Sequence, residues 1–234
     1  AIHCARNFSE KISNENIESA LEKITLGLRS SNVVSNKIKK IRAYNEVGRA
    51  IVSAVINGIN SIDKITILPR SGFIGGYTKI APDDDVITSG LLSKKLLLSK
   101  IEIALAGRAA EIVVFGINEV TQYAANNINY STEIAKEMIT KYGFSVIGPV
   151  CLDQNNEEIF LGNSLLRNKS QIADKTSTII DNQIIRISKE ALENAILKIR
   201  NNRSILEKIV EVLIDEETID GNRFKELSTN LLKV

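Results

Sequence analysis

The sequence predicts a mainly α-helical fold with one small β-hairpin or sheet near residues 64–80. Two observations support this prediction. Apolar residues recur at helical spacing over most of the chain, and almost continuously from residue 88 onward. The segment at residues 64–80 differs, because it combines adjacent β-branched residues with a proline and several glycines, a pattern typical of two strands joined by a loop.

Two helices are expected before the hairpin. The first begins near Ser13, which can cap it, and ends at Gly27. A polar, basic stretch at residues 29–40 leads into the second helix, which Gly58 terminates. The apolar positions of this second helix are Ile38, Ile41, Ala50, Ile51, Ala54 and Val55.

The predicted hairpin has a first strand around residues 65–67, which Pro69 ends, and a second strand between Tyr77 and Ile80. The glycines between the strands do not form a phosphate-binding P-loop. Such a loop needs a Lys and a Ser or Thr directly after its last glycine, whereas Gly76 is followed by Tyr77. We therefore interpret the glycines as a turn, and exclude ATP hydrolysis through a P-loop in this chain.

The remainder of the chain is predicted to be helical. The first of these helices is strongly apolar, closes at Gly116, and contains the small residues Gly107, Ala109 and Ala110, which suit close contact with another helix. Further helices are expected at residues 124–141, 172–200, 204–219 and 221–227.

Composition limits the classes of function. The 234 residues include 30 basic and 28 acidic residues, a net charge of +2, so no overall field attracts nucleic acid. The two cysteines, Cys4 and Cys151, indicate a reducing compartment rather than a disulfide framework. No apolar run approaches the roughly 20 residues that span a bilayer. The chain begins at Ala1 in helical sequence, so we expect it to be part of a longer protein.

Histidine is too scarce for an ordinary zinc site. The chain contains a single histidine, His3, and it lies beside Cys4 at the start, where we interpret both residues as an ordinary helix end. The acidic run at residues 83–85 is interpreted as a polar loop after Pro82, because consecutive carboxylates do not converge on one point.

Several separated stretches resemble, in order and spacing, the peptidase domain of FtsH-type ATP-dependent zinc metalloproteases, especially the cyanobacterial and plastid branch. The match covers nearly the whole chain from about Ser13. These stretches are KITLG, KITILPR, GGYT, APDDD, LAGRAAEIVVFG, EVTQYAANNI, ITKYGFSVIGPV and NNRSILEKIVEVLIDEETIDGNRF. The resemblance implies that residues 1–30 end an AAA lid domain and that residues 31–234 form the peptidase-like domain.

The catalytic motif of that family, H-E-x-x-H, matches YNEVGRA in this sequence. The motif works because residues four apart share one helix face, so two imidazoles bind one zinc ion while the Glu acts as general base. Here the two ligand positions are occupied by Asn45 and Arg49, and the base position by Glu46. The family's third ligand, an Asp, corresponds to Asn127. All three ligand positions have therefore changed, and Glu46 is a relic of the base.

Arg49 is the most consequential of these changes, because a guanidinium group has five donors and no lone pair. At about 4 Å and an effective dielectric constant near 20, its charge repels a dication by roughly 8 kcal/mol. Glu46 lies three residues earlier, so the two side chains can form a surface-type pair on one helix face. We expect the guanidinium to occupy the position of the zinc ion and to pair with Glu46.

The resemblance and the altered ligands together predict a pseudoprotease: an inactive peptidase-like domain acting as a structural, regulatory or motor subunit. Two alternatives remain open. One is a functional ATP-dependent zinc metalloendopeptidase that degrades membrane proteins, and the other is a platform for assembly or protein import. No cofactor or metal is expected in this domain, although the resemblance implies zinc for the family, and ATP with magnesium in an upstream ATPase domain.

The resemblance also implies partners and a location. The expected partners are other FtsH-type subunits in a homo- or hetero-hexamer and unfolded or membrane proteins as substrates in quality control, without nucleic acid. An upstream anchor would attach the ring to a membrane. The abundance of Asn, Ile and Lys fits an AT-rich genome such as that of a plastid, so a thylakoid or inner envelope membrane is expected. The cytoplasmic face of a bacterial inner membrane is the alternative.

Overall fold

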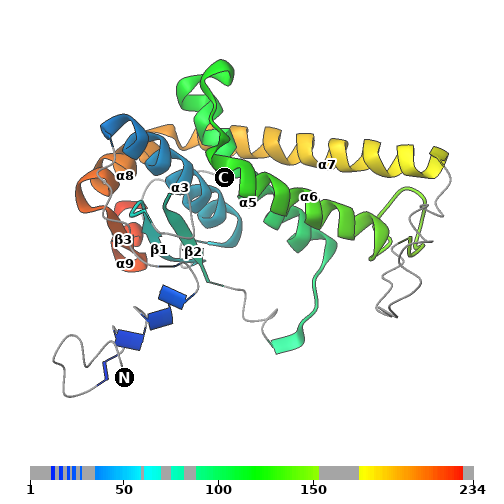
Figure 1. Ribbon diagram of the computed structural model, residues 1–234, viewed down its shortest axis with the longest axis horizontal. Helices are drawn as coiled ribbons and strands as arrows, with labels where there is room; N and C mark the ends of the chain where they lie inside the picture. Colours follow the sequence, from blue (N-terminus) through cyan, green and yellow to red (C-terminus); the bar gives the residue numbers. More distant parts are fainter. Residues whose placement is uncertain are drawn as a thin grey trace.

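A computed structural model describes residues 35–58, 61–69, 75–81, 88–152 and 174–228, together with separate residues between positions 12 and 27. The mainly helical fold with a small sheet is confirmed (Figure 1). Within the described ranges, no helix combines the length and the apolar character that crossing a membrane requires. The helix expected from Ser13 and the division at residue 30 stay predictions, because most of the first 34 residues lie outside the description.

Helix α3 (Asn36–Asn57) is the second helix that the sequence predicts. It begins in basic, exposed sequence and becomes almost entirely buried from Ala43 to Ala54, where apolar and small residues follow one another. The chain leaves the helix at Gly58, whose φ of 88° belongs to the left-handed region that glycine adopts most easily. The buried half of α3 is the centre of the molecule.

The sheet has three antiparallel strands in the order β2-β1-β3, and it packs beside α3 (Figure 1). Strands β1 (Ile62–Thr66) and β2 (Tyr77–Ile80) form the predicted hairpin, with Thr66 opposite Tyr77. Strand β3 (Thr218–Asp220) pairs with the other edge of β1, from more than 150 residues away.

The prediction that residues 204–219 are helical throughout is wrong at its end. Helix α8 (Arg203–Glu216) stops at Glu217, which adopts a left-handed conformation with a φ of 57°. The Glu217 carbonyl oxygen then accepts a hydrogen bond from the Ile67 amide at 3.1 Å, so the chain turns directly into β3. A three-residue strand is too short to give an alternating pattern, and its pairing depends on a distant strand.

Three long helices lie beside and beyond this centre. Helix α5 (Lys94–Phe115) packs against both α3 and α7 (Asp174–Asn201), and α6 (Ala125–Thr140) packs against α5 and α7 (Figure 1). The short 3-10 helices η2 (Ile117–Glu119) and η3 (Gln122–Ala124) connect α5 to α6. The expected role of the small residues of α5 is supported, because Ala109 and Ala110 are completely buried.

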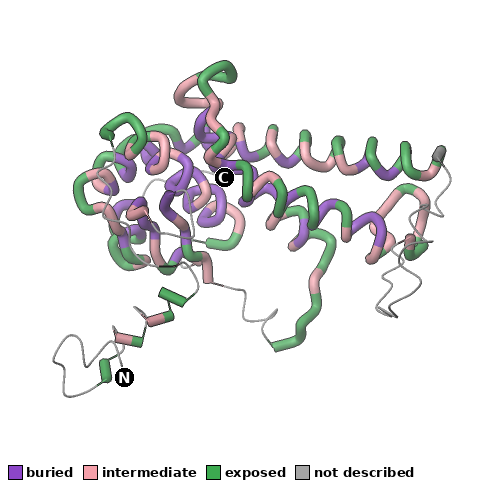
Figure 2. The backbone as a smooth tube through the Cα atoms, in the orientation of Figure 1, coloured by how far each residue is buried: buried purple, intermediate pink, exposed green. Residues whose placement is uncertain are grey.

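The apolar side chains form two clusters joined through α5 and α7. The larger one includes the buried faces of α3, β1, α8 and helix α9 (Gly221–Ser228), whereas the smaller one lies between α5, α6 and α7. Figure 2 shows buried backbone concentrated along α3 and along the faces of α5 that meet its neighbours. The N-terminal part of α7 extends beyond α3 and the sheet, alongside α6 (Figure 1).

Candidate functional site

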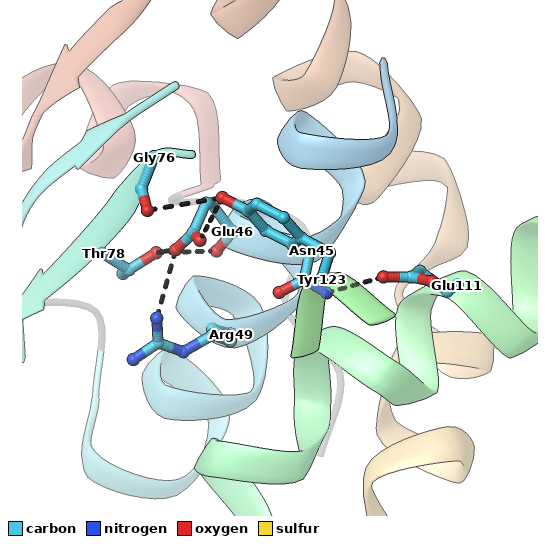
Figure 3. A network of polar contacts seen from close by, with 7 residues as sticks. All are labelled: Asn45, Glu46, Arg49, Gly76, Thr78, Glu111 and Tyr123. Carbon is cyan, nitrogen blue, oxygen red and sulfur yellow. Dashed lines mark hydrogen bonds and ion pairs between the residues drawn. The ribbon is translucent and has the colours of Figure 1, made fainter. Parts of the chain in front are cut away.

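The middle of α3 brings Asn45, Glu46 and Arg49 together, covered by β2 on one side and by α5 and η3 on the other (Figure 3). Asn45 is fully buried and Glu46 is 2% exposed. A buried carboxylate needs charged or hydrogen-bonding partners, because it loses its hydration. The partners of these three side chains therefore determine what the site can do.

The Glu46 carboxylate accepts hydrogen bonds from three protein side chains. Arg49 Nη1 lies 3.2 Å from Oε2, and Thr78 Oγ1 on β2 lies 2.8 Å from the same oxygen. The Tyr123 hydroxyl on η3 lies 3.1 Å from Oε1 (Figure 3). Thr78 Oγ1 is also 3.0 Å from the Glu46 backbone oxygen, which ties β2 to α3. Both carboxylate oxygens therefore face donors of the protein itself.

The pair expected between Arg49 and Glu46 is present, but it is not a surface pair. The exposed fractions of the two side chains are 18% and 3%, because β2 and η3 cover this turn of α3. Arg49 Nε is buried and has no hydrogen-bond partner among the residues that the structure describes. Since a buried pair is screened less by solvent than an exposed one, it holds both side chains more firmly than the sequence spacing alone suggests.

Asn45 faces the opposite way, toward α5. Its Nδ2 donates to Glu111 Oε1 at 2.9 Å, and Glu111 Oε2 accepts the Thr121 backbone amide at 2.6 Å (Figure 3). Asn45 Oδ1 is buried without a hydrogen-bond partner and lies against Gly107, where a Cβ atom would overlap it. The absence of a side chain at Gly107 is what lets Asn45 fit between α3 and α5.

Tyr123 is positioned by its own short helix. Thr121 Oγ1 accepts the Tyr123 backbone amide at 3.3 Å, which fixes the start of η3. The Tyr123 hydroxyl is also 3.3 Å from the Gly76 backbone oxygen, just before β2. Burial raises the pKa of Tyr123, and the negative charge and hydrogen bonding of Glu46 raise it further. Tyr123 therefore stays a neutral donor beside the carboxylate.

Asn127 lies in the first turn of α6, one turn after Tyr123, and is half-buried. It takes no part in the hydrogen-bond network around Glu46. Across the described ranges, no three or more His, Cys, Asp or Glu side chains gather where they could hold a metal ion. His3, Cys4 and the acidic run at residues 83–85 lie outside those ranges.

Three members of the site were not identified from the sequence: Thr78, Glu111 and Tyr123. All three lie within stretches that carry the family resemblance, and that was the available signal for them. The contacts themselves join segments 32 to 77 residues apart and could not be derived from local pattern.

A buried helix, α3, packed between a small antiparallel sheet and further helices defines the class: a mainly helical domain with one small sheet. Comparison with known proteins identifies the family within that class. The family model described as Peptidase family M41 matches residues 32–227. The chain belongs to peptidase family M41.

The chain is similar to several ATP-dependent zinc metalloproteases. It is 34% identical over 227 residues to FtsH of Cyanidium caldarium, covering 97% of this chain and 36% of that protein. It is also 34% identical to FtsH 3 of Synechocystis over 98% of this chain and 37% of the relative. For the chloroplastic FTSH 8 of Arabidopsis thaliana, the identity is 34% over 100% of this chain and 33% of the relative. The chain therefore spans about a third of the length of these relatives.

The donors at the two helix positions do not fit the zinc ion that the names of these relatives imply. Arg49 supplies only N–H groups and is already paired with Glu46. Asn45 offers one oxygen without a hydrogen-bond partner among the described residues, but that oxygen lies against Gly107 on α5 and belongs to an uncharged amide. Zinc in proteins is held by imidazole, thiolate or carboxylate groups, and neither position provides one.

Proposed function

We propose that this domain is a catalytically inactive, peptidase-like member of family M41, and that it serves an FtsH-type complex as a structural, regulatory or motor subunit. The observation that carries the proposal is the contact between Arg49 and Glu46. A cation tethered at a ligand position is paired with the residue that would serve as general base, at 3.2 Å. This arrangement neutralises the base and repels a metal at the same time.

The burial of the ion pair between Arg49 and Glu46 gives the proposal further support. Breaking a buried ion pair leaves an uncompensated charge, so zinc would have to overcome both the repulsion of Arg49 and the loss of its partner. Two amide side chains at the remaining ligand positions, Asn45 and Asn127, carry no charge that could offset those terms. A functional ATP-dependent zinc metalloendopeptidase is therefore the less favoured alternative.

The setting of the domain is also a proposal. The relatives include proteins of cyanobacteria and one named as chloroplastic, which supports a plastid location, with a bacterial membrane as the alternative. We propose that the full protein carries an upstream ATPase domain that uses ATP and magnesium, and a membrane anchor. It would join other FtsH-type subunits in a homo- or hetero-hexamer that handles unfolded or membrane proteins. An assembly or protein-import platform is a further form of the same non-proteolytic role.

The proposal is tested by metal content and proteolysis. The full-length protein is incubated with zinc, desalted, and assayed by elemental analysis and by ATP-dependent degradation of casein with and without a chelator. We expect zinc well below one ion per chain and no chelator-sensitive cleavage. Stoichiometric zinc with cleavage that the chelator abolishes would establish an active protease and refute the proposal.

Restoring the ligands tests whether the metal site is recoverable. The triple variant Asn45→His, Arg49→His, Asn127→Asp returns two imidazoles four residues apart and a carboxylate. We expect zinc binding to return in this variant but not in a matched control with Asn118→His, Arg203→His and Asn129→Asp on exposed positions. If the triple variant binds no more zinc than the control, the site has changed beyond its three ligands.

A further inference from the structure

Tyr123 and Thr78 both reach Glu46 from outside α3, and Tyr123 is the one of the two that contacts Oε1. Its side chain extends from η3 to the Glu46 carboxylate on α3 and to the backbone that leads into β2 (Figure 3). A Cβ atom at Gly75 would overlap the Tyr123 ring, so the ring lies directly on the backbone there. The contacts of the Tyr123 side chain with Glu46, Gly75 and Gly76 involve none of the three altered ligand positions.

We propose that Tyr123 closes this site in addition to the lost metal ligands, because its hydroxyl lies between Glu46 Oε1 and the backbone carbonyl of Gly76. The proposal rests on the proposed function, because it takes Glu46 as the relic of a general base. It goes beyond the proposed function because it assigns a second obstruction to Tyr123, which lies outside the Asn-Glu-x-x-Arg motif of α3. Restoring the three ligands is then insufficient to restore peptide hydrolysis.

The first part of the obstruction concerns water. A general base must lie within about 2.6–3.2 Å of the water whose proton it takes. Glu46 Oε2 is occupied by Arg49 and Thr78, which leaves Oε1 as the oxygen that could accept a proton from water. The Tyr123 hydroxyl lies 3.1 Å from that oxygen, at the distance where the water would lie. Replacing Arg49 frees part of Oε2 and leaves the Tyr123 hydroxyl on Oε1.

The second part concerns the substrate backbone. In the described sheet β2 pairs with a strand on one side only, and an edge of this kind is where an extended peptide can add as a further strand. The Gly76 carbonyl oxygen, one residue before β2, accepts from the Tyr123 hydroxyl at 3.3 Å. With the ring packed on Gly75 as well, this end of the edge has no room for a second backbone.

The first experiment needs no metal. The natural full-length protein and its Tyr123→Ala variant are titrated into a fluorescent casein-derived peptide, and binding is followed by anisotropy. Removing the Tyr123 ring from the edge of β2 should lower the Kd for the peptide by about tenfold, which corresponds to 1.4 kcal/mol. Tyr130→Ala serves as the matched control, because Tyr130 is a half-exposed tyrosine on α6. Equal affinities for the natural protein and both variants would overturn the substrate half of the proposal.

The second experiment combines Tyr123→Ala with the triple variant that restores the ligands, and measures bound zinc and casein cleavage in each protein. We expect equal zinc in both, and cleavage higher by at least about 100-fold in the quadruple variant, the low end of what a general base contributes. A further version with Tyr123→Phe keeps the ring and removes the hydroxyl. This version should lose the hydrogen bond to Glu46 while its ring still covers Gly75. Its cleavage rate should therefore lie between those of the triple and the quadruple variants.

The outcomes separate the two proposals. Cleavage by the triple variant at the level of the quadruple variant refutes the block by Tyr123 and leaves the proposed function intact. Chelator-sensitive cleavage by the natural protein refutes the proposed function. If the restored variants bind no zinc and Tyr123→Ala does not tighten peptide binding, the block is refuted as well. Circular dichroism and the thermal midpoint confirm that each variant is folded.

Discussion

At the scale of single residues, the site consists of the buried carboxylate of Glu46 and the side chains that donate hydrogen bonds to it. Glu46 would be costly to bury alone, and three donors from α3, β2 and η3 make its burial possible. The same donors contact both oxygens of the carboxylate. A satisfied polar network of this kind stabilises the folded state.

Replacing Glu46 with Gln should lower the free energy of unfolding by about 2–4 kcal/mol, because Arg49 keeps its buried charge and loses its counter-ion. Urea denaturation of both proteins measures the change. Glu207→Gln is the control, since Glu207 pairs with Arg203 at 2.9 Å on the exposed face of α8 and its loss should cost less than about 1 kcal/mol. Equal effects of the two substitutions would show that the network around Glu46 has no stabilising role.

Tyr123 should resist ionisation in the folded protein, because burial and Glu46 raise its pKa. The folded state then holds this proton more tightly than the unfolded chain, in which tyrosine ionises near pH 10. Stability from this source is present in full below about pH 10 and falls above it. The absorbance difference at 295 nm between the natural protein and Tyr123→Phe should stay flat until alkali unfolds the chain. A tyrosinate signal from Tyr123 in the folded protein contradicts this expectation.

At the scale of elements, the site exists because an edge strand and a short helix are both anchored to α3. Thr78 links β2 to α3 through its hydroxyl, and the Thr121 amide links the segment before η3 to Glu111 on α5. Helix α5 therefore supports two parts of the site: it accommodates Asn45 at Gly107 and holds η3 through Glu111.

The N-terminus of α5 offers a test at this scale. Ser93 Oγ accepts the Leu96 backbone amide at 3.2 Å, which satisfies one of the unpaired donors of the first turn. Ser93→Ala should lower the free energy of unfolding by about 1 kcal/mol, and Ser93→Asp, which keeps an acceptor, should be close to neutral. Thermal and urea denaturation of the two variants provide the comparison. Identical losses in both would mean that capping is not what Ser93 contributes.

At the scale of the whole molecule, two apolar clusters share α5 and α7. The cluster around α3 contains the functional site, and the cluster between α5, α6 and α7 lies farther along the same helices. Because both clusters include residues of α5, loosening one should weaken the other. The chain should therefore unfold in one cooperative step rather than in two.

A cavity in the smaller cluster tests that expectation. Ile101 is completely buried on α5, and Ile101→Ala should lower the free energy of unfolding by about 2–5 kcal/mol. Hydrogen exchange of the amides of α3 should accelerate by the corresponding factor, although α3 does not belong to that cluster. Leu98→Ala, at an exposed position of the same helix, is the control. Unchanged protection in α3 would show that the two clusters unfold separately.

Much of the site could be predicted from the sequence because its central features are local. The i,i+3 spacing of Glu46 and Arg49 on one helix was sufficient to predict their contact, and the structure confirms that contact. Its burial was not predicted, because burial depends on the strand and helix that cover the turn. Thr78 and Tyr123 were missed for the same reason: their roles depend on loops that return them to α3.

The helical class and the hairpin followed from local sequence, because helical periodicity and β-branched residues are properties of short segments. Three features depended on the folded chain: β3 joins the sheet from the far end of the sequence, the charge pair is buried, and Tyr123 reaches the Glu46 carboxylate. These are contacts between segments distant in sequence, and the packing of the whole chain fixes them together.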